Sequence, residues 1–270
     1  MKSSSEMLRV ALAQWRPGEE PQDNTERIRE FAKKAVASGA ALLVTPEYSL
    51  SSPAHKDESW RARAEPLDGG FVQALRLISA ENDGIVIACG MLEHNPAGQP
   101  FNSLVMVGSD GVLAVNRKIH LYDAFGHKES QWLAAALAED PQIASLEGWL
   151  VGGQTCYDLR FPEVTRRLVE FGADLIVIPS QWVPGPHKIH HWRTLIHARA
   201  IESQSWIVAV DQPEPDGVGH TMVVSPMGEA VIELGPGEDF QVANIDHALV
   251  ESTRAANPVF QANRFRLDWK

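Results

Sequence analysis

The sequence contains only two cysteines, Cys89 and Cys156, among its 270 residues. They form no CxxC spacing, so they predict neither a disulfide framework nor a zinc knuckle. No stretch approaches the roughly 20 consecutive apolar residues that a membrane-spanning helix needs. The polar segment 1–7 lacks the apolar core of a signal peptide. We therefore expect a cytoplasmic protein that has no contact with a membrane.

Basic residues are also scarce, with 24 Lys and Arg against 35 Asp and Glu and a formal charge of -11. Since phosphate contacts dominate nucleic-acid affinity, this balance argues against nucleic-acid binding. There is no GxSxG, P-loop or GxGxxG motif, which removes the usual sequence basis for serine hydrolysis, phosphoryl transfer and hydride transfer. The 44% hydrophobic content is enough for a sizeable core.

Cys156 stands at a predicted turn between a strand and a helix. An apolar run at 149–151 leads into the segment Gly-Gly-Gln-Thr-Cys-Tyr-Asp-Leu-Arg-Phe-Pro-Glu, and a helix is expected to begin at Pro162. In open α/β sheets, ligands collect at the carboxyl ends of strands. Cys156 is therefore a candidate nucleophile, provided that a base or a cation lies nearby. Cys89, in the apolar strand 85–91, is more simply a small buried hydrophobic residue.

The order of predicted elements repeats in the two halves of the chain. The first half gives a strand at 8–15, a helix capped by Asp23 with Glu26 in a capping box, a strand at 41–45, a helix at 70–82 with Asp68 as a possible cap, a strand at 85–91 and a hairpin of 103–107 with 112–119. The second half gives a helix from Pro162 to Gly172, a strand at 175–178, a helix at 188–203, a strand at 206–210 and a hairpin of 221–224 with 230–234.

The two halves also share sequence. Gly-Ala-Ala-Leu-Leu-Val-Thr-Pro, ending at Pro46, parallels Gly-Ala-Asp-Leu-Ile-Val-Ile-Pro, ending at Pro179. The next residues, Glu47 and Ser180, should therefore face a shared cleft. The fold that fits is an α/β protein of four layers, an α-β-β-α sandwich of two mixed sheets with a pseudo-twofold internal repeat. No linker divides the chain, so we expect one domain over residues 1–270.

Three residues are candidate partners for the thiol. Glu47 follows a strand that should be buried, where a carboxylate is costly unless it is paired or functional; a strand-end glutamate that reaches solvent or pairs with an arginine is at least as common. Strand alternation turns Lys118 and Arg117 to opposite faces, although most lysines lie on the surface. Glu129 follows a glycine-bearing loop and is equally consistent with a helix-start acid.

Together these segments resemble the carbon–nitrogen hydrolase (nitrilase) superfamily. The resemblance rests on Pro-Glu at Glu47, Arg-Lys-Ile-His-Leu around Lys118, and Cys-Tyr-Asp-Leu-Arg-Phe-Pro-Glu from Cys156, in that order, and it spans nearly the whole chain. It implies a Glu47, Lys118, Cys156 triad supported by Glu129, and it implies the same four-layer sandwich. The closest branch is the amidase-like one, which includes omega-amidases and amidases of deaminated glutathione.

The resemblance implies hydrolysis of a small amide through a thioester, with Lys118 and the backbone N–H of Tyr157 stabilising the oxyanion. No metal or other cofactor is expected. By the repeat, Gln181 and Trp182 are candidates to line the pocket, although core packing fits Trp182 equally well. Arg160 either binds a substrate carboxylate or pairs with Asp158 or Glu163.

Other interpretations remain open at this point. The histidines His187, His190, His191 and His197 have a spacing that suits zinc, although a solvated helix start is the simpler interpretation. Nitrile hydration, carbamoyl cleavage or acyl transfer would use the same residues, and a non-catalytic interaction protein would keep the fold. The apolar tail 254–270 suits docking on a second copy of the chain, so a homodimer or larger homo-oligomer is expected.

Overall fold

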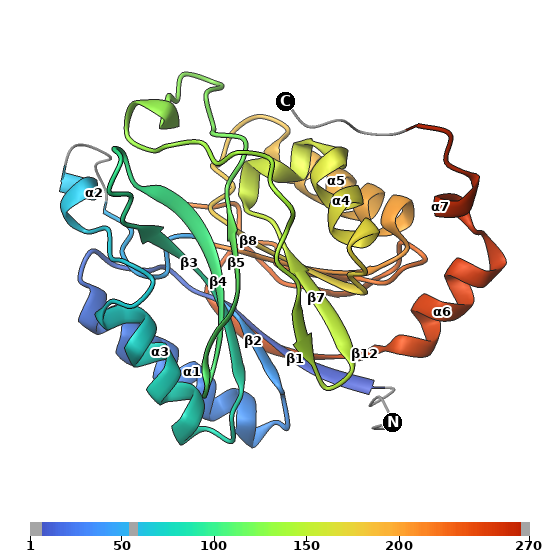
Figure 1. The fold of residues 1–270 in the computed structure, drawn as a ribbon, viewed down its shortest axis with the longest axis horizontal. Coiled ribbons are helices and arrows are strands. Elements are labelled where there is room, and N and C mark those ends of the chain that lie inside the picture. The colour runs from blue at the N-terminus through green and yellow to red at the C-terminus, as the bar shows by residue number, and fades with distance from the viewer. Residues whose placement is uncertain (1–6, 54–58, 266–270) are drawn as a thin grey trace.

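Two six-stranded mixed β-sheets face each other at the centre of the computed structural model, which describes residues 7–53 and 59–265 (Figure 1). The first sheet has the order β12 (Asp239–Asp246), β1 (Met7–Gln14), β2 (Leu42–Val44), β3 (Val86–Glu93), β4 (Phe101–Gly108) and β5 (Gly111–Arg117). The second has the order β6 (Ala144–Leu146), β7 (Trp149–Gly153), β8 (Leu175–Ser180), β9 (Trp206–Asp211), β10 (Met222–Val224) and β11 (Ala230–Glu233).

The two sheets have the same pairing pattern. From β12 to β5, the strand pairs are antiparallel, parallel, parallel, antiparallel and antiparallel. From β6 to β11, the sequence of pairings is identical. In this alignment β2 corresponds to β8, the two strands whose sequences match. The predicted internal repeat is confirmed.

Helices cover the outer face of each sheet, which gives the predicted four layers (Figure 1). The helices α1 (Pro21–Ala37) and α3 (Gly70–Glu81) pack on the first sheet, and α4 (Pro162–Glu170) and α5 (Lys188–Ser203) pack on the second. A third apolar cluster, with residues such as Val44 and Val177, fills the space between the sheets. The remaining helical elements are α2 (Ser59–Ala62), α6 (His247–Ala256), α7 (Val259–Ala262) and two 3₁₀ turns, η1 (Glu129–Gln131) and η2 (Cys156–Arg160).

The predicted helix caps are wrong. Helix α1 begins earlier, at Pro21 with Glu20 as N-cap, because proline suits the first helical position. Asp23 lies inside its first turn. Helix α3 has Gly69, not Asp68, as N-cap. There the Glu65 carboxylate accepts the Phe71 N–H at 2.8 Å. A side chain outside the helix therefore satisfies a backbone N–H of its first turn.

The C-terminal part of the chain adds elements that the sequence patterns did not indicate. Strand β12 pairs with β1 along its full length, and α6 follows it with Asp246 as N-cap. In the tail, Phe260 packs against the apolar cluster between the second sheet and its helices. Phe265 is 82% exposed, and Trp269 lies outside the described residues. Docking of this tail on a second copy stays a prediction.

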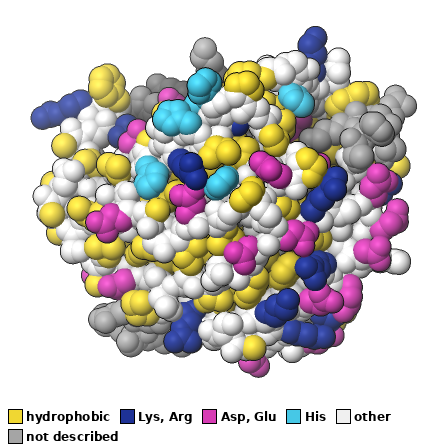
Figure 2. Space-filling view, turned by 180° about the vertical axis from the view of Figure 1, so that it is seen from behind, with side chains coloured by type: hydrophobic (Ala, Val, Ile, Leu, Met, Phe, Trp, Pro, Cys, Tyr) yellow, Lys and Arg dark blue, Asp and Glu magenta, His cyan; other side chains and the backbone are white. Residues whose placement is uncertain are grey.

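The described helices include none that is both long and apolar enough to cross a bilayer. On the face seen in Figure 2, lysines and arginines lie interspersed with acidic side chains rather than in a continuous basic track. Within the described ranges, no three His, Cys, Asp or Glu side chains are grouped to hold a metal ion. His197 directs its Nδ1 to the Gly228 carbonyl at 2.8 Å, and His191 lies beside Arg160.

Gly90, on β3, allows the chain after β2 to approach closely. A Cβ added at Gly90 would lie 2.6 Å from the Tyr48 nitrogen and 2.7 Å from the Glu47 Cα. Both contacts are backbone, so Gly90→Ala must displace the Glu47 turn. We expect a loss of about 1–3 kcal/mol in the free energy of unfolding.

Urea melts measure the effect of Gly90→Ala. Gly98→Ala is the matched control, because an added Cβ there meets nothing within 4 Å. A Gly90→Ala variant that unfolds at the same urea concentration as the wild type would show that the chain after β2 can move without cost.

Candidate active site

The ends of the two equivalent strands meet at the mouth of the sandwich. Glu47, after β2, is 1% exposed. Its Oε2 accepts the backbone N–H of Gln181, directly after β8, at 2.6 Å. From β9's end, the Gln212 side-chain amide donates to the Glu47 carbonyl at 2.8 Å. Glu47 does not reach solvent, and the two strand ends meet as expected, but the residue that shares a cavity with Glu47 is Gln181 and not Ser180, which is fully buried.

Lys118 is buried between two carboxylates. Its Nζ lies 3.0 Å from Glu47 Oε1 and 2.9 Å from Glu129 Oε2, with 1% of the side chain exposed. Arg117 faces the other way, with 40% of its side chain exposed, and donates from Nε to Glu93 Oε2 at 2.8 Å. Alternation therefore sends one cation inward and one outward, as predicted, and the surface alternative for Lys118 is wrong.

Glu129 is both a helix-start residue and a member of the buried cluster. It begins η1, and its carboxylate accepts the Tyr48 hydroxyl and, at 2.6 Å, the Tyr122 backbone N–H. Asn102, on β4, donates to Glu47 Oε1 at 2.7 Å. The sequence analysis did not identify Tyr48, Tyr122 and Asn102 as site residues. Only Tyr48 carried a signal, since it follows Glu47 directly.

Cys156 is held in a strained backbone conformation at the start of η2. Its φ is 47°, in the left-handed region, which costs a non-glycine residue of order 1–3 kcal/mol. Its Sγ lies 3.5 Å from the Gln181 carbonyl oxygen, and the residue is 7% exposed. The sharp turn after β7 thus directs the thiol toward the strand ends that carry Glu47 and Gln181.

A cavity of about 280 Å³ brings the predicted residues together. Glu47, Lys118, Glu129, Cys156 and Gln181 all line it, along with residues that include Tyr48 and Tyr122. Its volume suits a small organic molecule.

Three other predicted residues lie beside this cavity rather than in its lining. Tyr157 packs edge-on against Tyr122, with ring centroids 5.1 Å apart. Trp182 is 2% exposed and belongs to the core between the second sheet and its helices. The centroid of its ring lies 5.4 Å from that of Trp192. Arg160 places its guanidinium carbon 4.8 Å from the Trp182 ring centroid.

Burial and neighbouring charges set the protonation of the inner groups. Burial alone would lower the pKa of Lys118, but the charges of Glu129 and Glu47 outweigh it and raise that pKa well above its usual range. Burial and the Glu47 charge raise the pKa of the Cys156 thiol, against the opposing effect of Lys118. At neutral pH, the cavity therefore holds a lysine ammonium and a protonated thiol. Burial raises the pKa of Cys89 to about 12.

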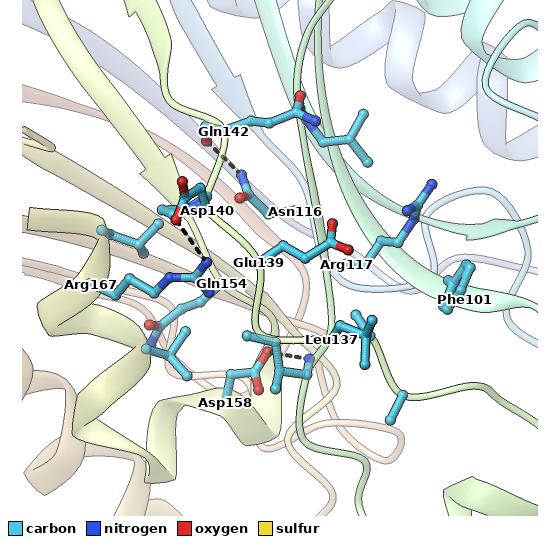
Figure 3. A pocket seen from close by; sticks show the side chains of 18 of the residues that line it. Phe101, Asn116, Arg117, Leu137, Glu139, Asp140, Gln142, Gln154, Asp158 and Arg167 are labelled. Carbon is cyan, nitrogen blue, oxygen red and sulfur yellow. Dashed lines mark hydrogen bonds and ion pairs between the residues drawn. The ribbon is translucent and has the colours of Figure 1, made fainter. Parts of the chain in front are cut away.

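Asp158, in η2, links the turn that carries Cys156 to the segment that follows Lys118. Its carboxylate accepts the backbone N–H groups of Ile119 at 3.3 Å and His120 at 2.9 Å. It borders a second cavity, of about 270 Å³, which Figure 3 shows with Gln154 and Arg167 nearby. Because neighbours along an extended segment alternate in direction, Ile119 lines the second cavity while Lys118 lines the first.

The fold and the cavity agree with comparisons to known proteins. The family model described as carbon-nitrogen hydrolase matches residues 9–255. A hydrolase of Mycobacterium tuberculosis is 35% identical, covering 92% of each chain. The deaminated glutathione amidase of Escherichia coli O157:H7 is 32% identical, covering 90% of this chain and 92% of the other.

A solved structure shows the same architecture. Nit3 of Saccharomyces cerevisiae, a member of the nitrilase superfamily, superposes with a TM-score of 0.85 at 26% identity, covering 98% of this chain and 99% of the other. The sequence match runs across nearly the whole chain, and both six-stranded sheets are present. The chain therefore belongs to the carbon-nitrogen hydrolase family, within the nitrilase superfamily.

Proposed function

We propose that this chain hydrolyses the C–N bond of a small linear amide through a thioester on Cys156, releasing ammonia or an amine and a carboxylic acid. The observation that carries the proposal is the placement of Lys118 between Glu47 and Glu129, 3.0 and 2.9 Å away, in the cavity that also holds the Cys156 thiol. A base, a cation and a nucleophile in one cavity suit acyl transfer.

In the first half-reaction, Glu47 takes the thiol proton as Cys156 Sγ attacks the amide carbonyl. The base is needed because the thiol is protonated at neutral pH. Lys118 stabilises the resulting oxyanion, aided by the Tyr157 backbone N–H, which directly follows the nucleophile. The protonated Glu47 then gives its proton to the departing nitrogen. The C–N bond breaks and the acyl group remains on Cys156.

In the second half-reaction, Glu47 takes a proton from water as the water oxygen attacks the thioester. The carbon–sulfur bond breaks, the acid leaves, and the sulfur recovers its proton from Glu47. Glu129 keeps Lys118 in place, and the Tyr48 and Tyr122 donors fix Glu129 in turn. This arrangement lets one carboxylate serve both half-reactions.

The names of the relatives favour amide hydrolysis over the other reactions that the same residues could carry out. Deaminated glutathione amidases of Escherichia coli and Rattus norvegicus are each 32% identical to this chain. We therefore place the substrate among omega-amidase-like compounds, and Arg160, beside the cavity wall, is the candidate contact for a substrate carboxylate. Gln181 lines the cavity there, and Trp182 packs behind it in the core.

A panel of linear amides, nitriles and N-carbamoyl amino acids tests the proposal. We expect ammonia release from the amides at a kcat/KM at least about 100-fold higher than from nitriles or carbamoyl compounds, because the named relatives are amidases. A preference for nitriles or carbamoyl compounds would replace amide hydrolysis by that reaction. No turnover of any kind would support a binding role instead.

A further inference from the structure

Asp211 is a buried carboxylate that the proposed chemistry does not use. It is the last residue of β9 and is fully buried. Its Oδ1 accepts the backbone N–H of Trp182 at 2.7 Å, and its Oδ2 accepts that of Val218 at 2.8 Å. Burial raises the pKa of the Asp211 carboxyl well above its usual range, and the opposing effects come from the backbone N–H groups that bind it. Burial of a carboxylate is costly, so this position calls for an explanation.

A single peptide group connects Asp211 to the thiol. The Trp182 N–H that Asp211 accepts belongs to the same peptide group as the Gln181 carbonyl, whose oxygen lies 3.5 Å from Cys156 Sγ. This peptide bond is trans, and a trans peptide group is planar, with its N–H and C=O pointing in opposite directions. Asp211 therefore anchors one side of the group whose other side contacts the thiol. A tilt of this peptide plane would move the carbonyl away from Cys156.

The same backbone segment also holds the proposed base. The Gln181 N–H donates to Glu47 Oε2 at 2.6 Å, so the consecutive N–H groups of Gln181 and Trp182 bind two different carboxylates. Gln212, directly after Asp211, donates from its side chain to the Glu47 carbonyl at 2.8 Å. The same side chain accepts the Gln181 side-chain amide at 3.1 Å. The end of β9 thus contacts both Glu47 and the segment that orients it.

Asp211 itself has little freedom to move. A Cβ added at Gly217 would lie 2.8 and 2.9 Å from the carboxylate oxygens Oδ2 and Oδ1, so the backbone of the following loop fits directly against them. The Asp211 N–H donates to the Thr221 hydroxyl at 3.1 Å. The carboxylate is therefore a fixed point against which the peptide group after Gln181 is aligned.

Resting on the proposed amidase chemistry, we propose that Asp211 is a positioning residue for Cys156 and Glu47. It holds the backbone at 181–182 so that the Gln181 carbonyl faces the thiol while the Gln181 N–H faces the base. Asp211 acts through this backbone and exchanges no proton with the substrate. Its contribution is to keep the base and the thiol in the alignment that proton transfer requires.

Alkylation of Cys156 by iodoacetamide at neutral pH, read by peptide mass mapping, tests this role without an amide substrate. Asp211→Asn keeps the shape of the side chain but turns an NH₂ group toward one of the two N–H donors. We expect alkylation about 10- to 100-fold slower than in the wild type, because the base and the thiol lose their alignment. Loss of the charge alone would act in the opposite direction, since the Asp211 charge raises the pKa of the Cys156 thiol. Unchanged or faster alkylation would overturn the inference.

Asp174→Asn is the matched control for the loss of a buried aspartate. Asp174 directly precedes β8, at the end of that strand opposite to Gln181, and it pairs with Arg254. We expect it to lower stability but to leave the alkylation rate within about twofold of wild type. A thermal melt shows which variants are folded. If Asp211→Asn is not, Asp211→Ser replaces it, because the shorter side chain leaves room for a water molecule.

Steady-state kinetics separates this inference from the amidase function. On an amide that the wild type cleaves, Asp211→Asn should lower kcat by the same factor as alkylation and leave KM within about threefold, as expected when only the reacting geometry is lost. A raised KM with unchanged kcat would contradict a positioning role. A wild type that is alkylated at Cys156 but cleaves no amide would refute the amidase function, and the alkylation rates would still decide the role of Asp211.

Discussion

Replacing Cys156 by alanine should lower kcat/KM for ammonia release by about 10⁴-fold or more, because no other described group lining the cavity is a thiol. The residual rate would come from Lys118 and substrate binding alone. The substitution removes one sulfur atom from a residue that is 7% exposed, so folding should persist. Ammonia release by the purified variant, together with a thermal melt, measures both effects.

Cys89→Ala is the matched control for this loss. Cys89 is fully buried in β3, and burial raises its pKa to about 12. We expect full turnover and a cost of about 1 kcal/mol in the free energy of unfolding. If Cys156→Ala keeps more than a tenth of wild-type turnover, Cys156 is not the nucleophile.

Glu47→Gln should lower kcat by about 10³-fold, since the amide cannot take the proton in either half-reaction. Glutamine keeps the shape of the side chain and still offers an oxygen to the N–H of Gln181 or to Asn102. Its NH₂ group also meets the Lys118 ammonium, which loses one of its two carboxylate partners. Steady-state kinetics on an amide cleaved by the wild type measures the effect.

Glu93→Gln controls for the loss of a buried acid with a basic partner. Glu93 is 4% exposed and pairs with Arg117. Arg117 points away from Lys118, so this ion pair does not belong to the cavity that holds Cys156. The substitution should lower stability but leave kcat within about threefold of wild type. A Glu47→Gln variant as active as Glu93→Gln would show that Glu47 is not the base.

The sequence predicts the site well where chemistry follows local geometry. The matching strands that end at Pro46 and Pro179 place Glu47 and Gln181 at one edge, and period-two alternation separates Lys118 from Arg117. Each of these inferences needs only a few neighbouring residues and the repeat. The same locality explains why the strand-to-helix turn at Cys156 could be anticipated.

Other features depend on contacts between distant segments. The cap of α3 comes from Glu65, outside the helix, so the apparent cap Asp68 misleads. Asn102 reaches Glu47 across 55 positions of the chain, and Lys188 reaches Tyr122 across 66. The sequence around these residues does not indicate such long-range hydrogen bonds, because they depend on side-chain packing throughout the sandwich.

The most direct test of the account is peptide mass mapping of wild-type protein quenched in acid during turnover of a linear amide. We predict that the peptide containing Cys156 gains the mass of the acyl group, which is the amide minus ammonia. The gain should vanish on treatment with hydroxylamine, which cleaves thioesters. An initial burst of ammonia with Cys156 unmodified, or with the acyl group on another side chain, would contradict the thioester mechanism.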